Sequence, residues 1–275
     1  MNNSPVVEHI QLSNKPIKYN LHFHNNHQMI FVISGRILIE FNQSRVYEAG
    51  PDSLVFISNL EEHSTKILEE PYERYNLMLV PSGLDRVIKD SLLLSVFRNR
   101  PATFCNVFDV SSISKKVNDI FSSLYSEAAN NNIDDFSVAM MGCLLYELIV
   151  NVYRNNQADF PSFSKDIPPQ IYKIRKYIDN NFSQPISLNE LAKDNYISTS
   201  YMSHCFKRLT GYSPMQYMQL NRLSYSRSML SNVDLTVSEI AYRSGFSDVN
   251  NFIRAFKSYY GTTPGQVRKH GRKGV

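Results

Sequence analysis

Cysteine is scarce in this chain, with three in 275 residues. Cys105, Cys143 and Cys205 lie far apart and form no Cys-x-x-Cys pair, so neither a disulfide framework nor a cysteine-rich zinc site is expected. Free cysteine is among the residue types most often found buried. We therefore expect all three to be small buried side chains.

Long apolar runs are also lacking. No stretch reaches the roughly 18 residues that a membrane-spanning helix needs, and the first residues hold no basic segment followed by an apolar one. A Gly-rich phosphate loop, a Gly-x-Ser-x-Gly elbow and a His-Glu-x-x-His motif are likewise missing. We expect a cytoplasmic protein with no membrane partner and none of those three catalytic motifs.

The composition is that of a globular protein. Hydrophobic residues make up 43% and charged residues 20% of the chain, and at about 100 to 200 residues per domain the length favours two domains. Residues 1–164 carry 13 Lys+Arg and 18 Asp+Glu, whereas residues 165–275 carry 16 and 7. An acidic part followed by a basic part is typical of a DNA-binding module attached to a domain that does not contact DNA.

The N-terminal part is β-rich and then helical. Runs at 29–33, 36–41, 53–57 and 75–80, separated by turn signals such as Ser34-Gly35, predict a small barrel or sandwich. The segment 135–154 is apolar around most of its circumference and predicts a buried helix. Before it, apolar residues recur three and four apart, and this stripe either packs on the barrel or forms a dimer seam. Its members are Val110, Ile113, Val117, Ile120 and Leu124.

The C-terminal part contains an internal repeat at a spacing of 49 to 50 residues. Residues 186–192 correspond to 235–241, and in each copy a hydroxyl residue precedes a Glu by three, the capping-box spacing that opens a helix. Asn195 and Gly245 lie in the following turns, where both tolerate the left-handed conformation of a sharp bend. Second helices at 199–209 and 249–259 end at Gly and then Pro.

Each of these second helices has an apolar face, expected to be core, and a polar face. A helix pair with a tight turn, whose second helix presents short polar and basic side chains, has the geometry that enters the DNA major groove. Arg can bind guanine, Asn can bind adenine, and Ile can contact a thymine methyl. The predicted base contacts are Ser200, Ser203 and His204 in the first copy and Asn250, Ile253 and Arg254 in the second.

Residues from about 168 to 270 resemble the DNA-binding domain of the AraC/XylS family. The resemblance is carried by residues 188–192, 206–208, 211–214, 222–223, 240–241, 244–246, Phe252, Arg254, 256–257 and 261–264. It implies seven helices, with a long helix setting two recognition helices about one DNA turn apart, and it implies promoter DNA and RNA polymerase as partners. Phosphate contacts, which position a protein without reading sequence, are assigned to Lys173, Arg175, Lys207 and Lys257.

Residues 15–80 resemble the cupin pattern of a small β-barrel, through His22, His24, Gln28, Gly35 and His63. In that pattern His and Glu residues bind a metal, but Gln28 stands in the Glu position, and a neutral amide is a poorer ligand than a carboxylate. We therefore expect no metal and no cofactor, and interpret His22, His24, Gln28 and His63 as a pocket for a small polar effector. Histidines satisfied in the core or at the surface are the alternative.

The sequence thus predicts an α+β two-domain protein. A cupin-like β-barrel with trailing helices spans 1–160, a linker 161–169, and an all-α domain 170–275. The all-α domain holds helix-turn-helix units at about 187–210 and 236–260, joined by a helix at about 214–231. The predicted function is an effector-responsive, homodimeric transcription regulator and not an enzyme. Two alternatives remain: a metal-dependent cupin oxygenase or isomerase using His22, His24 and His63, and a module that docks a protein through 110–124.

Overall fold

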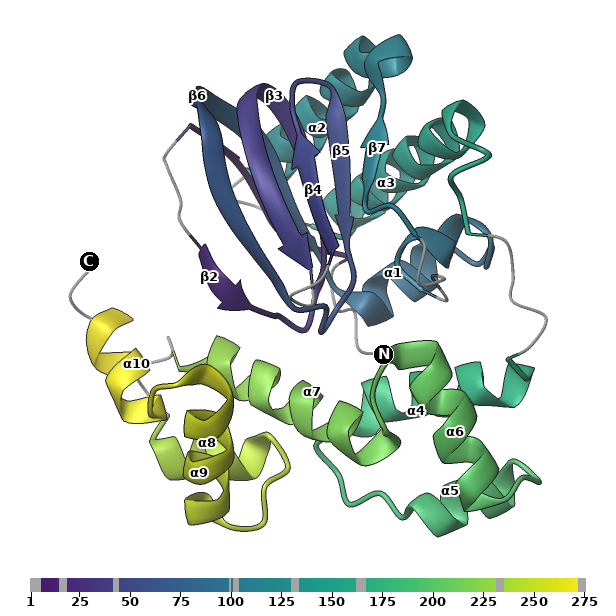
Figure 1. Cartoon of the computed structure of the whole chain (residues 1–275), viewed down its shortest axis with the longest axis vertical. Helices are drawn as coiled ribbons and strands as arrows, with labels where there is room; N and C mark the ends of the chain where they lie inside the picture. The colour runs from purple at the N-terminus through teal and green to yellow at the C-terminus, as the bar shows by residue number, and fades with distance from the viewer. Residues whose placement is uncertain are drawn as a thin grey trace. The chain divides into compact units, whose positions relative to one another are not determined.

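The computed structural model describes residues 6–14, 19–41, 45–98, 100, 104–129, 134–161, 167–230 and 235–271. The chain divides into two compact units, Met1–Ser164 and Lys165–Val275 (Figure 1). This division falls within the segment 161–169 expected to be the linker, of which 162–166 lie outside the described residues.

The described residues of the N-terminal unit form one antiparallel sheet of seven strands in the order β1-β6-β3-β5-β7, with β2 added on β6 and β4 on β3. Helices α2 and α3 pack on it (Figure 1). The elements are β1 Val7–Ser13, β2 Tyr19–His22, β3 His27–Phe41, β4 Arg45–Ala49, β5 Ser53–Ile57, β6 His63–Leu79, α1 Pro81–Val87, the 3-10 turn η1 Leu93–Val96, β7 Val107–Asp109, the 3-10 turn η2 Ser111–Ile113, α2 Ser114–Ala128 and α3 Asp135–Asn155.

The expected strands at 29–33 and 36–41 are two halves of the single strand β3. The Ser34-Gly35 signal marks a bend inside it, where the register with β6 is irregular. Gly35 has φ +75°, and a Cβ there would lie 2.6 Å from the Glu69 carbonyl oxygen, so the bend requires glycine. Before the bend β3 pairs with β5, and after it β3 pairs with β4.

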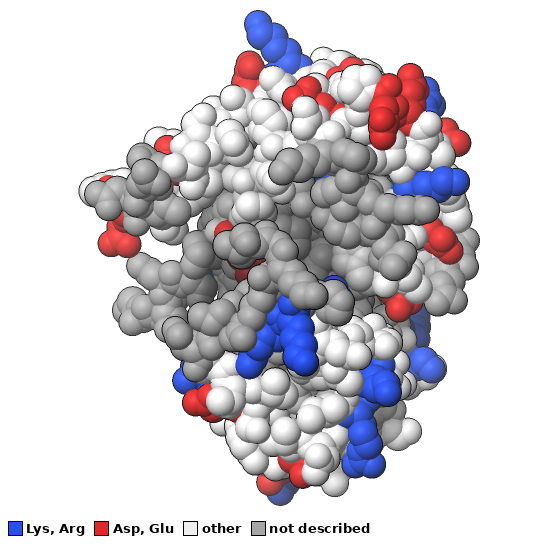
Figure 2. Space-filling model, turned by 90° about the vertical axis from the view of Figure 1, so that its left-hand side faces the viewer, with Lys and Arg blue, Asp and Glu red and all other residues white. Residues whose placement is uncertain are grey.

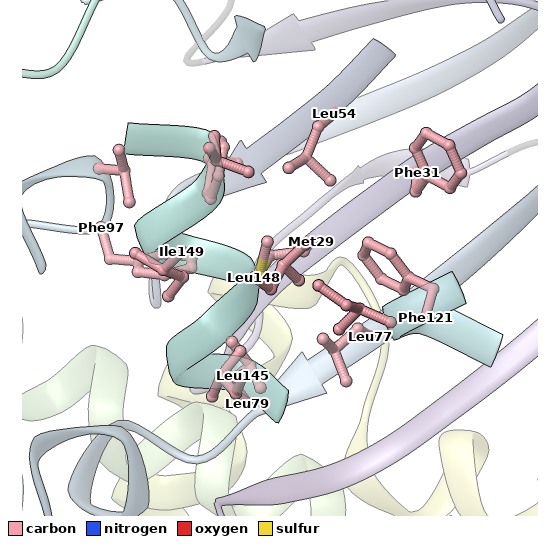
Figure 3. Close-up of a cluster of buried hydrophobic side chains, with 14 of the residues drawn as sticks. Met29, Phe31, Leu54, Leu77, Leu79, Phe97, Phe121, Leu145, Leu148 and Ile149 are labelled. Carbon is pink, nitrogen blue, oxygen red and sulfur yellow. The ribbon is translucent and has the colours of Figure 1, made fainter. Parts of the chain in front are cut away.

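Both faces of β3 are buried. Ile30 and Val32 face one apolar cluster, while Met29 and Phe31, which alternate with them, face the helices. Figure 3 shows side chains of the sheet meeting Phe121 of α2 and residues of α3. The labelled residues of this second cluster are Met29, Phe31, Leu54, Leu77, Leu79, Phe97, Phe121, Leu145, Leu148 and Ile149.

The stripe read as a possible dimer seam lies inside the core of its own unit. Val110, Val117, Ile120 and Leu124 are buried, and Ile113 packs against the same cluster. The seam interpretation is therefore wrong, and the alternative, helices packed on the barrel, is confirmed. An apolar stripe at heptad spacing marks a buried helix face but does not tell which surface covers it.

By length and composition α3 could cross a membrane, because its 21 residues contain an 18-residue window of mean hydropathy 1.6. This corrects the expectation that no stretch reaches that length. The buried side of α3, including Met141, Leu145 and Leu148, belongs to the sheet–helix core, and a core helix can match the composition of a membrane helix.

The first half of the opposite side of α3 exposes apolar side chains as well, up to the charged Glu147, and we call it the α3 outer face: Phe136, Met140, Cys143 and Tyr146. Phe136 is 83% exposed, Met140 52% and Tyr146 42%. Cys143 and Cys105 are exposed and Cys205 is buried, so the expectation of three buried cysteines is right for Cys205 alone.

The C-terminal unit is all-α, with seven helices in its described part, as the resemblance implied. They are α4 Pro169–Asn181, α5 Leu188–Asp194, α6 Thr199–Thr210, α7 Pro214–Met229, α8 Val237–Arg243, α9 Val249–Tyr260 and α10 Pro264–Gly271. α5 and α6 form the first helix-turn-helix, α8 and α9 form the second, and α7 runs between them (Figure 1).

The helix ends follow the sequence signals closely. Ser187 and Thr236 cap α5 and α8, and Thr236 forms a full capping box with Glu239. In the turn of the second helix-turn-helix, between α8 and α9, Gly245 has φ +88° as expected. In the first, Asn195 has φ −101° and Tyr196 takes the left-handed conformation at φ +57°, so that expectation is wrong by one residue. The side-chain amide of Asn195 (Nδ2) instead donates to the Leu191 carbonyl oxygen at 2.8 Å.

Candidate DNA-binding interface and effector pocket

The first recognition helix, α6, has the two faces expected of it. Met202, Cys205 and Phe206 are buried. Of the predicted base-contacting residues, Ser200 and His204 are exposed and Ser203 is half-buried, and the predicted phosphate ligand Lys207 is exposed. Ser198 caps the helix, accepting a hydrogen bond from the Tyr201 amide at 3.2 Å.

The second recognition helix, α9, also has one buried face and one polar face. Phe252 and Phe256 are buried, whereas Asn250, Arg254 and Lys257 are exposed. Ile253 is half-buried and packs against the core of the second helix-turn-helix, so part of its apolar surface serves packing. Asp248 caps the N-terminus of α9 by accepting a hydrogen bond from the Asn251 backbone N–H, one of the first N–H groups that have no partner within the helix.

Among the predicted phosphate ligands, Arg175 is misassigned. It is 8% exposed and lies 3.8 Å from Asp179 in an ion pair on α4. With Ile171, Ile174 and Ile178 it forms the buried face of that helix. A buried guanidinium cannot reach a phosphate from outside. Lys173 lies on the exposed side of α4.

The surface charge follows the asymmetry of the sequence. In Figure 2 blue Lys and Arg side chains predominate in the lower part of the view, which is the C-terminal unit, while red Asp and Glu side chains are more frequent in the upper part. Exposed basic residues of the C-terminal unit include Lys173, Lys176, Lys193, Lys207, Arg208, Arg227, Arg243, Arg254, Lys257 and Lys269. This charge favours a polyanionic partner.

The two helix-turn-helix units meet at residues 182–184, which we call the junction segment. From α7, Arg222 donates to the Phe182 carbonyl at 2.6 Å and to the Gln184 carbonyl at 3.0 Å. Gly245, in the turn between α8 and α9, approaches Ser183 so closely that a Cβ on residue 245 would lie 2.6 Å from the Ser183 carbonyl oxygen. The junction segment, which leads from α4 to α5, therefore contacts both α7 and the turn that precedes α9.

In the N-terminal unit, three of the four predicted pocket residues form a histidine cluster, His22, His24 and His63. The His22 and His63 ring centroids lie 4.3 Å apart and those of His24 and His63 5.1 Å apart. Gln28 joins them, since its Oε1 lies 2.8 Å from His24 Nε2 and its Nε2 donates to Asn76 Oδ1 at 2.6 Å. Burial, followed by the charges of His24 and His22, holds the pKa of His63 well below its usual value.

Comparison with known proteins matches a family domain to each part of the chain. A family profile described as the AraC-like ligand binding domain matches residues 4–145, and another described as a helix-turn-helix domain matches residues 191–270. The chain belongs to the AraC family of transcriptional regulators. It is thus a DNA-binding transcription regulator with an N-terminal ligand-binding domain.

Relatives of similar length cover nearly the whole chain. It is 23% identical over 252 residues to the Msm operon regulatory protein of Streptococcus mutans, covering 89% of this chain and 84% of that one. It is 24% identical over 255 residues to the transcriptional activator RhaS of Klebsiella pneumoniae, covering 92% and 88%. ToxT of Vibrio cholerae, solved with a bound unsaturated fatty acid, shares the fold at 15% identity and TM-score 0.63, covering 97% and 95%.

Beside the histidine cluster, the AraC-like domain holds a buried ionic network that the sequence did not reveal. Glu61 accepts hydrogen bonds from Arg45 at 2.9 Å, from the Ser58 amide at 2.8 Å and from Arg100. The Glu61 side chain is 8% exposed and that of Arg100 10%. The Glu61 carbonyl oxygen accepts from His63 Nδ1 at 2.9 Å, so the network also fixes one pocket residue.

Proposed function

We propose that this AraC-family regulator reads promoter DNA in two successive major grooves, with α9 as the principal reader. α9 exposes Arg254 and Asn250, which match guanine and adenine edges, whereas α6 offers two serines and His204. The observation that carries the proposal is that both recognition helices bury one face and expose the polar one. Lys173, Lys207 and Lys257 contact phosphates and position the helices.

Selection of bound sequences from a random DNA library, at about 0.15 M salt to suppress non-specific phosphate attraction, tests this proposal. We expect a motif of two blocks whose centres lie about 10 base pairs apart, because each recognition helix enters one major groove. A single block would contradict base reading by α6. Absence of any enriched motif, with and without cell extract as an effector source, would contradict sequence-specific reading altogether.

The same library selection, repeated with two variants, distinguishes a residue that contacts bases from a residue that contacts phosphates. Arg254→Ala should erase the preference at one base position, worth about 1–3 kcal/mol of discrimination. Lys257→Ala should weaken all sequences alike and reduce the slope of log affinity against log salt by about 0.9. Binding isotherms over a salt series measure both quantities. Equal effects of the two substitutions would contradict the assigned roles.

A homodimer is part of the proposal, and the α3 outer face is the surface we assign to it. Phe136, Met140 and Cys143 recur at spacings of four and three, which is seam spacing. A groove of about 600 Å³, lined partly by Val87, Cys143 and Tyr146, adjoins them. Two copies of one helix pairing antiparallel about a twofold axis would cover this exposed apolar surface.

Cys143 provides a direct test of that dimer, because it lies near the middle of α3 and would approach its counterpart at the twofold axis. Oxidation with copper phenanthroline should cross-link the Cys105→Ser variant into a covalent dimer. The Cys143→Ser variant, which keeps the exposed Cys105, is the matched control and should stay monomeric on a denaturing gel. Cross-linking through Cys105 alone would place the interface elsewhere.

The effector site belongs to the same proposal, at His22, His24, Gln28 and His63. Four polar side chains converge inside a domain whose family profile is a ligand-binding domain. The domain binds its ligand and does not transform it. Relatives named activators support RNA polymerase as the partner of the promoter-bound chain, and both DNA and polymerase place it in the cytoplasm.

A further inference from the structure

The turn of the first helix-turn-helix has the same backbone structure as the turn of the second. At the repeat spacing of 49 residues, Tyr196 corresponds to Gly245. The backbone N–H of Tyr196 donates to the Lys193 carbonyl oxygen at 3.0 Å, and that of Gly245 donates to the Tyr242 carbonyl oxygen at 2.9 Å. Both residues are left-handed, with φ +57° and +88°. The two turns therefore present corresponding surfaces.

Among the described residues, the Gly245 turn is covered and the Tyr196 turn is open. Gly245 packs on Ser183 of the junction segment, whose carbonyl oxygen a Cβ would meet at 2.6 Å. Tyr196 carries a large side chain that is 96% exposed. A bulky residue rarely adopts positive φ, and backbone strain of this kind is concentrated at functional positions. An exposed aromatic ring thus stands where the second repeat makes its contact with the first.

The repeat also indicates the direction that the Tyr196 turn faces. The two helix-turn-helix units lie at opposite ends of α7 (Figure 1), and the Gly245 turn faces the first of them because it contacts Ser183. The proposed entry of α6 and α9 into successive major grooves, in one orientation, relates the two units by a shift of one DNA turn. The Tyr196 turn then faces away from the second unit, along the DNA and towards the next groove.

The surface beside Tyr196 suits a protein partner. A groove of about 320 Å³ between α4 and α5 is lined partly by Asn195 and by Tyr177, which is 47% exposed. Two exposed carboxylates, Glu190 and Asp194, line the same groove. Aromatic side chains are enriched at protein interfaces, whereas the phosphates of DNA repel carboxylates. The expected partner is therefore a basic protein surface and not DNA.

We propose that Tyr196 anchors a contact between two copies of this chain bound in tandem on adjacent DNA sites. The occupant is the second helix-turn-helix of the neighbouring copy, at the side formed by the end of α7 and the start of α8. By the repeat, this side corresponds to the α4–α5 side that Gly245 contacts within one copy. Exposed Arg227, in the last turn of α7, gives it positive charge.

Such a head-to-tail contact is heterologous, so it can continue along DNA, unlike the twofold contact assigned to the α3 outer face. The inference rests on the proposed entry of both recognition helices into successive grooves. It adds a partner, a second copy, to the free end of the first helix-turn-helix.

Binding of the full-length protein to DNA probes that carry the selected motif once or twice tests this contact. In the double probe the motifs are direct repeats about 21 base pairs apart, two helical turns, which continues the spacing of the two blocks. We expect the second copy to bind about 10-fold more tightly than the first. Insertion of half a helical turn between the motifs should remove this coupling, because it places the copies on different sides of the DNA.

Tyr196→Gly separates the contact from a structural role, because it should stabilise the fold and yet remove the coupling. Glycine adopts positive φ without a steric penalty, so the urea midpoint should rise while the coupling falls to about one-fold. Tyr196→Phe is the matched control, since it keeps the ring and should keep the coupling.

Affinity for the single-motif probe reports on groove reading separately and should be equal in the wild type and both variants. Failure of the wild type to bind that probe would contradict the proposed function. Coupling that persists in Tyr196→Gly, or that survives the half-turn insertion, would overturn the contact and assign the coupling to another surface such as the α3 outer face. Unchanged coupling together with weaker retention of RNA polymerase by Tyr196→Gly would assign the surface to polymerase instead.

Discussion

Gly245→Ala is expected to abolish tight promoter binding and to destabilise the second helix-turn-helix. An L-residue at φ +88° is strained by about 1–2 kcal/mol. The new Cβ would also stand 2.6 Å from the Ser183 carbonyl oxygen and 2.7 Å from Ser183 Cα. Backbone atoms cannot rotate away as a side chain can, so the turn must move, at a further cost of about 1–3 kcal/mol.

A displacement of the Gly245 turn affects DNA binding because the junction segment also contacts α7. Arg222 of α7 binds the carbonyls on either side of Ser183, and Phe182 contacts the ring of Tyr225 at a centroid distance of 5.5 Å. Moving Gly245 away from Ser183 therefore changes the position of α9 relative to α6. Because both helices must enter grooves of fixed spacing, a small shift removes one of the two sets of base contacts.

Gly211→Ala is the matched control for this prediction. Gly211 has φ +82°, but nothing lies within 4 Å of a Cβ built there, so only the conformational cost applies. Hydrogen exchange should show faster exchange in α8 and α9 for Gly245→Ala alone, and promoter affinity should fall far more than in Gly211→Ala. Equal losses in the two variants would mean that the contact with Ser183 does not set the position of α9.

The C-terminal unit was predictable because its signals are local. Capping residues, Gly–Pro stops and a repeat with one apolar face per helix fixed both helix-turn-helix units to within a residue or two. Arg175 shows where charge alone misleads. It was assigned to a phosphate contact because of its charge, although its spacing from Ile171, Ile174 and Ile178 already placed it on the buried face of α4. The periodicity of a helix is the better guide to exposure than the charge of one residue.

The N-terminal unit was predictable in outline only, because its contacts are non-local. Ser34-Gly35 was interpreted as a turn between two strands, but β3 continues through it because both halves pair with β6. Strand β1 pairs with β6, more than 60 residues later in the chain, and no local sequence pattern predicts such a pairing. The histidine cluster was found through a sequence pattern, whereas Glu61 carried no pattern at all.

Glu61→Ala should lower the free energy of unfolding of the N-terminal domain by about 3–5 kcal/mol, the usual result of removing one partner of a buried ion pair. Arg45 and Arg100 would lose their carboxylate, and the buried Asn106, whose amide lies 3.3 Å from both Glu61 oxygens, would lose an acceptor. Burial already lowers the pKa of Arg100, and Glu61 opposes that effect. Without Glu61, a desolvated guanidinium has no compensating charge.

Glu48→Ala is the control, because Glu48 pairs with Arg36 at 3.6 Å with side chains that are 57% and 49% exposed. Exposed pairs contribute about 0–1 kcal/mol. Urea unfolding followed by circular dichroism, which suits a chain without tryptophan, and hydrogen exchange in β5 compare the two variants. If the urea midpoint of Glu61→Ala lay as close to the wild-type midpoint as that of Glu48→Ala, the prediction would be wrong, and water would have to solvate Arg45 and Arg100 in place of the carboxylate.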